Sequence, residues 1–244
     1  MKTKIKATFK LTALLSILLL IGSCKPDKSP VTVAQETGTV TDIDGNSYKT
    51  IKIGNQWWMA ENLKVTKFRN GNIIPDVTVD TAWQNNTPAC CLYQNNTDAP
   101  GLLYNWFAVT DTENIAPEGW HIPTDEEWKE LERYIGMTNG AEEQSGWRGT
   151  NEADKLKAAA PTGWSPFENV WGSDSVGFTA LAGSCRRFDG EWGAPGLFAT
   201  GFWWTASAYS STEAWFRYLD YKKSNVFRSS SSKNYGYSIR CVKD

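Results

Sequence analysis

Residues Gly119–Gly136 read G-W-H-I-P-T-D-E-E-W-K-E-L-E-R-Y-I-G and hold the clearest local structure in the chain. Thr124 and Glu127 have the three-residue spacing of a capping box, which satisfies free backbone N–H groups at the start of a helix. Apolar side chains then recur at helical spacing, as Trp128, Leu131 and Ile135. Gly136 can adopt the left-handed conformation that ends a helix. The stretch therefore predicts a short amphipathic helix that packs against an aromatic core.

The first 23 residues have the pattern of an export signal rather than of a folded domain. Lysines precede an apolar segment, Leu11–Ile21, that is too short to span a bilayer as a helix. Small residues at 22 and 23 suit a peptidase, and Cys24 follows them directly, as in a bacterial lipobox. We expect cleavage before Cys24 and diacylglycerol on its sulfur, which would anchor the protein to a membrane. The alternative is an ordinary secretory signal with a chance cysteine.

Residues 24–37 are polar, carry two prolines and predict a flexible tether. Residues 38–244 show no internal repeat and are expected to form one domain. Removal of residues 1–23 takes away four of the 25 basic residues and none of the 27 acidic ones, which leaves a formal charge of −6. An acidic chain without a basic patch argues against nucleic acid as a partner.

Four cysteines follow the export signal and its candidate lipid site, at Cys90, Cys91, Cys185 and Cys241. An even number in an exported chain favours disulfide bonds. A bridge between adjacent Cys90 and Cys91 would be strained, so each would pair with Cys185 or Cys241. The alternative is that one or both pairs remain buried thiols.

The order of the predicted elements indicates an α+β domain with antiparallel strands. A second short helix is expected over residues 151–160, capped by Asn151 and ended by Pro161. Leu102–Val109 is apolar and fits either a buried helix or a strand. Tyr48, Ile51 and Ile53 give a strand signal, and further strand candidates lie over residues 56–60, 178–182, 202–206, 214–220, 225–228 and 237–242. The serine run 229–232 is expected to be a solvated loop, and residues 76–100 a long loop held by cysteines.

Several blocks of residues, in order, resemble the Fibrobacter succinogenes major paralogous domain, a family of exported bacterial proteins. They are Val40-Thr41-Asp42-x-Asp44-Gly45-Asn46, Trp58-Met59-Ala60-Glu61-Asn62-Leu63, Leu103-Tyr104-Asn105-Trp106, Gly119-Trp120-His121-Ile122-Pro123-Thr124-Asp125, Phe202-Trp203-Trp204-Thr205-Ala206-Ser207 and Ser238-Ile239-Arg240-Cys241-Val242. This family is in turn similar to formylglycine-generating enzymes and to C-type lectin-like domains. The resemblance implies two short helices packed on twisted antiparallel strands, with long loops.

The sequence gives little support to an enzymatic function. Formylglycine-generating enzymes use two nearby cysteines that bind copper, but no second cysteine follows Cys185 closely, although Arg186 and Arg187 could lower its pKa. His121 is the only histidine, and its place before a helix cap favours a structural hydrogen bond over a hydrolytic triad. The acidic residues 125–127 are explained by capping and by the helix dipole. We therefore expect a non-enzymatic protein without a cofactor or bound metal.

A binding function fits an exported, lipid-anchored and tryptophan-rich chain better. Sugars stack on aromatic rings while acids and arginines read their hydroxyl groups, and the candidate ligand-binding residues are Arg186, Arg187, Asp189, Glu191, Trp192, Tyr209 and Trp215. The expected partner is a glycan or an envelope protein at the bacterial cell surface, with the anchor in the outer membrane. A purely structural envelope scaffold is the alternative. For any single tryptophan, a place in the core is the competing interpretation.

Overall fold

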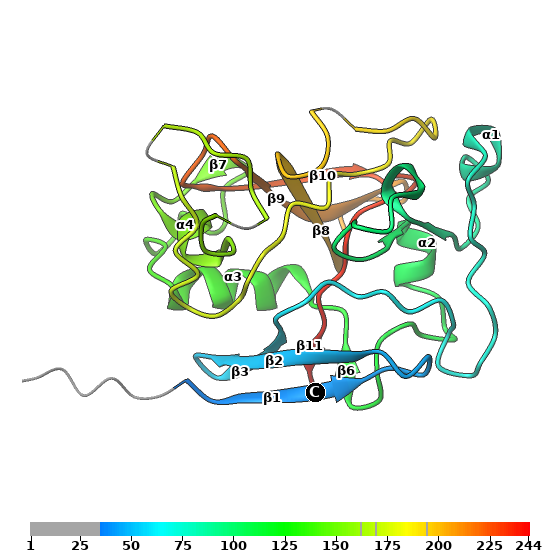
Figure 1. The fold of residues 1–244 in the computed structure, drawn as a ribbon, viewed down its shortest axis with the longest axis horizontal. Helices are drawn as coiled ribbons and strands as arrows, with labels where there is room; N and C mark the ends of the chain where they lie inside the picture. Colours follow the sequence, from blue (N-terminus) through cyan, green and yellow to red (C-terminus); the bar gives the residue numbers. More distant parts are fainter. Residues whose placement is uncertain (1–34, 162, 169, 194) are drawn as a thin grey trace, which may run out of the picture. The chain divides into compact units, whose positions relative to one another are not determined.

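The computed structural model describes residues 35–244 except 162, 169 and 194, and these residues form one compact unit (Figure 1). The expected signal peptide, the lipid site at Cys24 and most of the predicted tether lie outside the described residues. No helix within the described part of the chain combines the length and apolar character needed to cross a membrane. The architecture is α+β, with mostly antiparallel strands and a few short helices, as the sequence predicts.

A five-stranded antiparallel sheet joins the two ends of the compact unit. In spatial order its strands are β1 (Thr37–Thr41), β2 (Ser47–Ile53), β3 (Gln56–Met59), β11 (Val242–Lys243) and β6 (Trp120–His121). The turn between β1 and β2 is built by Asp42, whose carboxylate accepts hydrogen bonds from the backbone of Asp44 and Asn46 and from the Tyr48 hydroxyl. This turn joins β1 and β2 as an antiparallel hairpin.

A four-stranded antiparallel sheet carries most of the C-terminal half. In spatial order its strands are β7 (Gly146–Arg148), β10 (Val226–Ser232), β9 (Glu213–Asp220) and β8 (Thr200–Ala208). The prediction of a solvated loop at residues 229–232 is wrong, because these serines continue β10 and pair with β9. Ladder pairing outweighs the low strand preference of serine here.

A two-stranded sheet, β4 (Cys90–Cys91) with β5 (Leu103–Tyr104), lies in the segment predicted as a long loop. Helix α1 (Asp80–Trp83) and the 3₁₀ helix η1 (Tyr93–Asn95) also interrupt that segment. The apolar run after it divides between β5 and helix α2 (Trp106–Val109), so both alternatives left open for that run are partly right. Cys90 and Cys91 thus act as buried strand residues.

The organising helix, α3 (Asp125–Tyr134), begins at Thr124 with the predicted capping box, and Gly136 follows it with a positive φ of 111°. Helix α4 (Glu152–Leu156) is shorter than predicted. Asn151 gives it no side-chain cap; instead Glu152 accepts the backbone N–H groups of Thr150 and Asn151. The helix ends five residues before Pro161, because Ala158 leaves it to donate to the Ala180 carbonyl.

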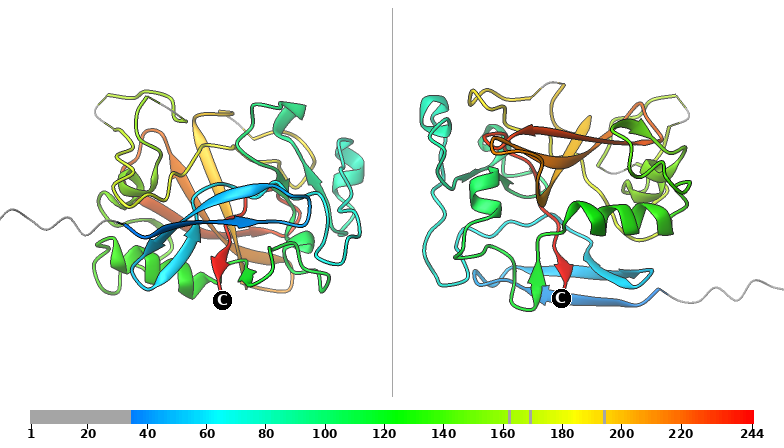
Figure 2. Two further views of the ribbon diagram at one scale, coloured as in Figure 1. Left: turned by 60° about the horizontal axis from the view of Figure 1, so that its bottom comes forward. Right: turned by 180° about the vertical axis from the view of Figure 1, so that it is seen from behind.

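Helix α3 lies between the two larger sheets, as Figure 1 and the right view of Figure 2 show. Its apolar face packs with residues of both sheets in one core cluster, where Trp58 of β3 and Trp203 of β8 lie with Trp128 and Leu131. The Trp58 and Trp128 ring centroids are 5.1 Å apart. Most tryptophans are buried, but Trp147 and Trp171 expose 37% and 46% of their surface. The interpretation of the tryptophans as core residues is therefore correct at most positions, and Trp147 and Trp171 are exposed at the surface.

Candidate functional site

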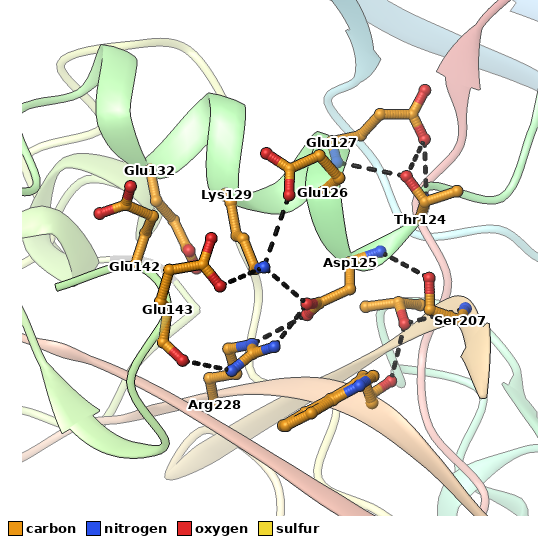
Figure 3. Close-up of polar contacts among 12 residues, drawn as sticks. Thr124, Asp125, Glu126, Glu127, Lys129, Glu132, Glu142, Glu143, Ser207 and Arg228 are labelled. Atoms are coloured by element: carbon orange, nitrogen blue, oxygen red, sulfur yellow. Dashed lines mark hydrogen bonds and ion pairs between the residues drawn. The ribbon is translucent and has the colours of Figure 1, made fainter. Parts of the chain in front are cut away.

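A charged cluster forms where the first turn of α3 meets the four-stranded sheet (Figure 3). Asp125 accepts from Arg217 of β9 at 2.7 Å and from Arg228 of β10 at 2.6 Å. Its backbone N–H donates to the hydroxyl of Ser207 at 3.0 Å. The helix start is therefore tied to three strands of the sheet at one residue.

A second part of the charged cluster lies about two turns further along α3. Glu132 is fully buried and accepts from Arg217 at 2.7 Å and from Arg148 of β7 at 2.9 Å. Buried charges are tolerated only where partners replace the lost water. In this cluster two carboxylates and three guanidinium groups pair with one another and so hold α3 against the sheet.

The pairing also governs how these groups titrate. Burial alone would raise the pKa of Asp125, but the hydrogen bond from Arg228 and the charge of Arg217 hold that pKa well below its usual range. Burial alone would lower the pKa of Arg217, but Glu132 and Asp125 outweigh it and raise that pKa. Both groups therefore stay charged at neutral pH, and the lowered pKa makes the Asp125 carboxylate a weak base that serves as the counter-ion of two arginines.

Lys129 extends the charged cluster toward solvent. Its ammonium group lies 2.6 Å from Glu143, 3.4 Å from Glu126 and 3.5 Å from Asp125. The side chains of Glu126 and Glu143 are 63% and 58% exposed, whereas that of Lys129 is 10% exposed. The carboxylates of Glu126 and Glu143 therefore lie at the solvent-exposed edge of the cluster, where they could contact a ligand, whereas the ion-paired Lys129 is largely buried (Figure 3).

Two of the predicted ligand-binding residues meet beside this cluster. Trp215 of β9 is half-buried and packs one ring face on Arg228, whose guanidinium carbon lies 3.7 Å from the ring centroid. Tyr209, in the turn after β8, is 57% exposed and meets Trp215 edge-to-face, with centroids 4.9 Å apart at 80°. Asp125 thus holds Arg228, Arg228 packs on the half-buried Trp215, and Trp215 contacts the exposed Tyr209.

The predicted loop 186–193 lies elsewhere and behaves differently. Arg186 is fully buried, and its guanidinium lies between the rings of Trp83 and Trp192, at 4.6 and 4.9 Å. It donates to the carbonyls of Val77, Thr78 and Gly190 and to Asp80. Arg186 therefore holds the loop against the segment around the start of α1 and offers no exposed surface to a ligand.

The other residues of this loop are only partly available. Arg187 is paired with Asp189 at 2.9 Å and with Glu191 at 3.5 Å. Trp192 is half-buried and packs its ring against Tyr93, with centroids 5.2 Å apart. In the described part of the chain, no hydrogen bond, ion pair or ring contact joins this loop to Tyr209 or Trp215. The predicted patch is thus two separate surfaces.

The expected disulfides are not formed among the described residues: Cys90, Cys91, Cys185 and Cys241 are all buried free thiols. Burial raises the pKa of Cys185 to about 12, against a small opposing effect of Arg187. The idea that neighbouring arginines activate this thiol is therefore wrong. Burial also raises the pKa of Cys91 to about 12, although Arg186 lies near it. A protonated, enclosed thiol is a poor nucleophile.

The single histidine makes structural contacts. Its two ring nitrogens lie 2.6 Å from Asp244 and 2.7 Å from Glu127. Burial would lower the pKa of His121, but hydrogen bonds to Asp244 and Glu127 outweigh it and raise that pKa. His121 therefore links the last residues of the chain to the capping box of α3.

The three arginines of the charged cluster were not among the functional residues predicted from the sequence. The available signal was the alternation in β9 and β10, where W-F-R-Y-L and V-F-R-S place an arginine at a position that faces inward. Strand period alone locates such a residue on a face, but does not show which carboxylates it meets.

The fold and these contacts define an α+β domain in which helix α3 is ion-paired to the four-stranded sheet and the exposed Tyr209 lies against the half-buried Trp215. The family model described as Fibrobacter succinogenes major domain matches residues 51–243, and the chain belongs to that family. The resemblance expected from the sequence motifs is thereby confirmed. No curated protein and no solved structure matches the chain.

Proposed function

We propose that this protein is a non-enzymatic, lipid-anchored module of the bacterial envelope that binds carbohydrate at Tyr209 and Trp215. The observation that carries the proposal is the exposed Tyr209 ring, held at 80° to Trp215 on a tightly bonded hairpin. An edge-to-face contact covers at most one face of the Tyr209 ring, which is 57% exposed, and an apolar ring face suits the apolar face of a sugar.

Polar groups on the same hairpin can read sugar hydroxyls. Residues 209–213 read Y-S-S-T-E, and the first four are exposed. The backbone N–H groups of Tyr209 and Ser210 donate to the Glu213 carbonyl, which fixes the turn. Glu213 in turn accepts from Ser230 at 2.6 Å. Short hydroxyl side chains on a rigid turn place donors and acceptors beside the ring at little entropic cost.

The state of the reactive groups supports a non-enzymatic role. The carboxylate of Asp125 is tied to arginines, the four described thiols are buried, and His121 lies between two carboxylates. None of these groups stands within reach of a nucleophile and a base in the manner of a catalytic triad. A formylglycine-generating type of thiol oxidation would need two accessible thiolates to bind copper, and this donor set does not fit.

The finer fold assignment and the location belong to the same proposal. A C-type lectin-like or formylglycine-generating-enzyme-like fold is supported by the pairing of N-terminal β3 with C-terminal β11 and by helices packed on twisted sheets. An outer-membrane anchor at Cys24 is supported by the lipobox-like sequence. An envelope scaffold without a glycan ligand is the second candidate, favoured by the extensive ion-pair locking of α3.

A glycan array probed with residues 35–244, the compact unit, tests the proposal. We expect saturable binding to at least one glycan, and a loss of about tenfold in affinity with Tyr209→Ala, which corresponds to about 1.4 kcal/mol. Tyr134→Ala is the matched control, because Tyr134 is 63% exposed but lies at the end of α3. Absence of binding to every glycan, or equal loss in both variants, would reject this site.

A further inference from the structure

An aromatic row crosses the four-stranded sheet on the face opposite α3. Each strand contributes one ring at the same register: Trp147 pairs with Phe227, Phe227 with Tyr218, and Tyr218 with Phe202. Residues directly opposite on neighbouring strands share a face, so these rings stand side by side. With neighbouring strands about 4.8 Å apart, the row spans about 14 Å.

The row continues beyond β8 toward the loop 187–191. Phe202 contacts the buried Tyr237 at 5.1 Å, Tyr237 contacts Tyr235 at 5.5 Å, and Tyr235 contacts Phe188 at 5.7 Å. The two outermost rings are the most accessible, at 37% for Trp147 and 47% for Phe188. Phe227, Tyr218, Phe202 and Tyr235 between them are half-buried and pack against the core, whereas Tyr237 is itself part of the core. Partly exposed rings therefore lie at the surface on both sides of the buried Tyr237.

The orientation of the rings favours a protein partner over a sugar. Phe202 and Tyr218 stack face to face, with centroids 4.5 Å apart and planes 9° apart, so their faces are used within the row. Tyr218 and Trp147 each meet Phe227 edge-to-face. Ring edges and aromatic side chains are common in protein interfaces, and contiguous apolar patches mark them.

The two ends of the row carry opposite charge. At the Trp147 end, the turn 220–223 has two exposed lysines and one carboxylate: Lys223 lies 5.9 Å from the Trp147 ring, and Asp220 already accepts from the Tyr218 hydroxyl. Within the described residues, Lys222 and Lys223 form no ion pair. At the Phe188 end, one arginine, Arg187, faces two carboxylates, those of Asp189 and Glu191.

We propose that the aromatic row is the interface of a homodimer, in which a second copy of the chain lies antiparallel across it. A two-fold axis through the middle of the row brings the lysine end of each copy onto the carboxylate end of the other. Such an interface uses the same patch on both subunits and is self-complementary. Apolar contact along the row supplies affinity, and the charged ends set the direction and exclude the parallel arrangement.

The test measures the mass of the full-length chain in detergent, at less than one chain per micelle, by analytical ultracentrifugation. We expect a dimer that dissociates as salt is raised, because exposed ion pairs are screened. Lys222→Glu with Lys223→Glu should give a monomer, and so should Asp189→Lys with Glu191→Lys. An equal mixture of the two double variants should restore a dimer, because each copy then meets the opposite charge at both ends.

The matched control is Lys49→Glu with Lys64→Glu, which reverses two exposed lysines away from the row and should leave the dimer intact. Trp147→Ala should weaken the dimer at least tenfold while circular dichroism shows an unchanged fold. A monomer at every concentration would overturn the proposal, and so would a dimer that ignores the charge reversals. Glycan binding at Tyr209 is measured separately, so failure of one proposal leaves the other standing.

Discussion

The two faces of the four-stranded sheet differ in what they present, although neighbouring residues build them. Trp147, Phe227, Tyr218 and Phe202 form the aromatic row, and the residue beside each in sequence points to α3: Arg148, Arg228, Arg217 and Trp203. A half-buried sheet usually turns polar residues to water and apolar ones inward. Here the arginines are buried and the aromatic rings lie partly exposed.

The face with the arginines is buried although it is the more polar of the two, because helix α3 covers it and supplies carboxylates to the arginines. Helix α3 brings Asp125 and Glu132 to the sheet, and each carboxylate meets two guanidinium groups. A hydrophobic helix would bury the arginines without partners at a cost of several kcal/mol each. The aromatic face has no such partner within the described chain, so its outer side stays open to another molecule.

The largest effect is expected from breaking the charged face. Arg217→Ala leaves Glu132 with one partner and Asp125 with Arg228 and Lys129, both carboxylates being buried. We expect a loss of about 3 to 5 kcal/mol in the free energy of unfolding, the usual result of removing one member of a buried ion pair. Urea unfolding of residues 35–244 measures it. The control is Lys52→Ala, whose exposed pair with Glu36 should be worth about 1 kcal/mol or less; equal losses would contradict the buried lock.

A smaller effect is expected from acid. The folded-state pKa of Asp125 is depressed below the unfolded value of about 3.9, so its stabilisation is fully present above that pH. It is lost as pH falls through the folded pKa, when Arg217 and Arg228 lose their shared carboxylate. The urea midpoint should therefore fall between pH 4 and pH 2. In Asp125→Asn this part of the slope should flatten; a slope as steep as in the parent chain would assign the acid sensitivity to other carboxylates.

The smallest effect is expected on the aromatic face. Trp147→Ala removes a ring that is already 37% exposed and lies on a short edge strand, so about 1 kcal/mol of stability should be lost. Trp203→Ala, on the opposite face and fully buried, should cost about 3 to 5 kcal/mol. Thermal unfolding of both variants at low protein concentration makes the comparison. Similar losses would mean that the aromatic face is as much a part of the core as the charged one.

Local chemistry made part of this structure predictable. The spacing of Thr124, Glu127 and Gly136 predicted the bounds of α3 to within two residues, because caps act through backbone groups a few residues away. The hairpin at Asp42 follows from the same kind of short-range bonding. Helix α4 ends earlier than predicted because the backbone N–H of Ala158 donates to the carbonyl of Ala180, which lies more than twenty residues away in the sequence.

The ligand surfaces show the limit of this reasoning. Arg186, Arg187, Asp189, Glu191 and Trp192 are adjacent in sequence and of the residue types that bind sugars, yet Arg186 is buried between two rings. Tyr209 and Trp215 were recognised as candidates, but the arginine and carboxylates that position them come from β10 and α3. Four cysteines in a chain expected to be exported suggested disulfides, but all four are buried free thiols in the structure.

The α+β class, the capped helix and the family were correctly predicted from the sequence alone. Each of these depends on residue types at short spacing, where the physical interaction is local. Only the tertiary structure decided which face of the sheet takes the charges, where the aromatic rings gather at the surface, and that the thiols remain separate. The reason is that strand period assigns a side chain to one of two faces, whereas long-range packing decides what that face meets.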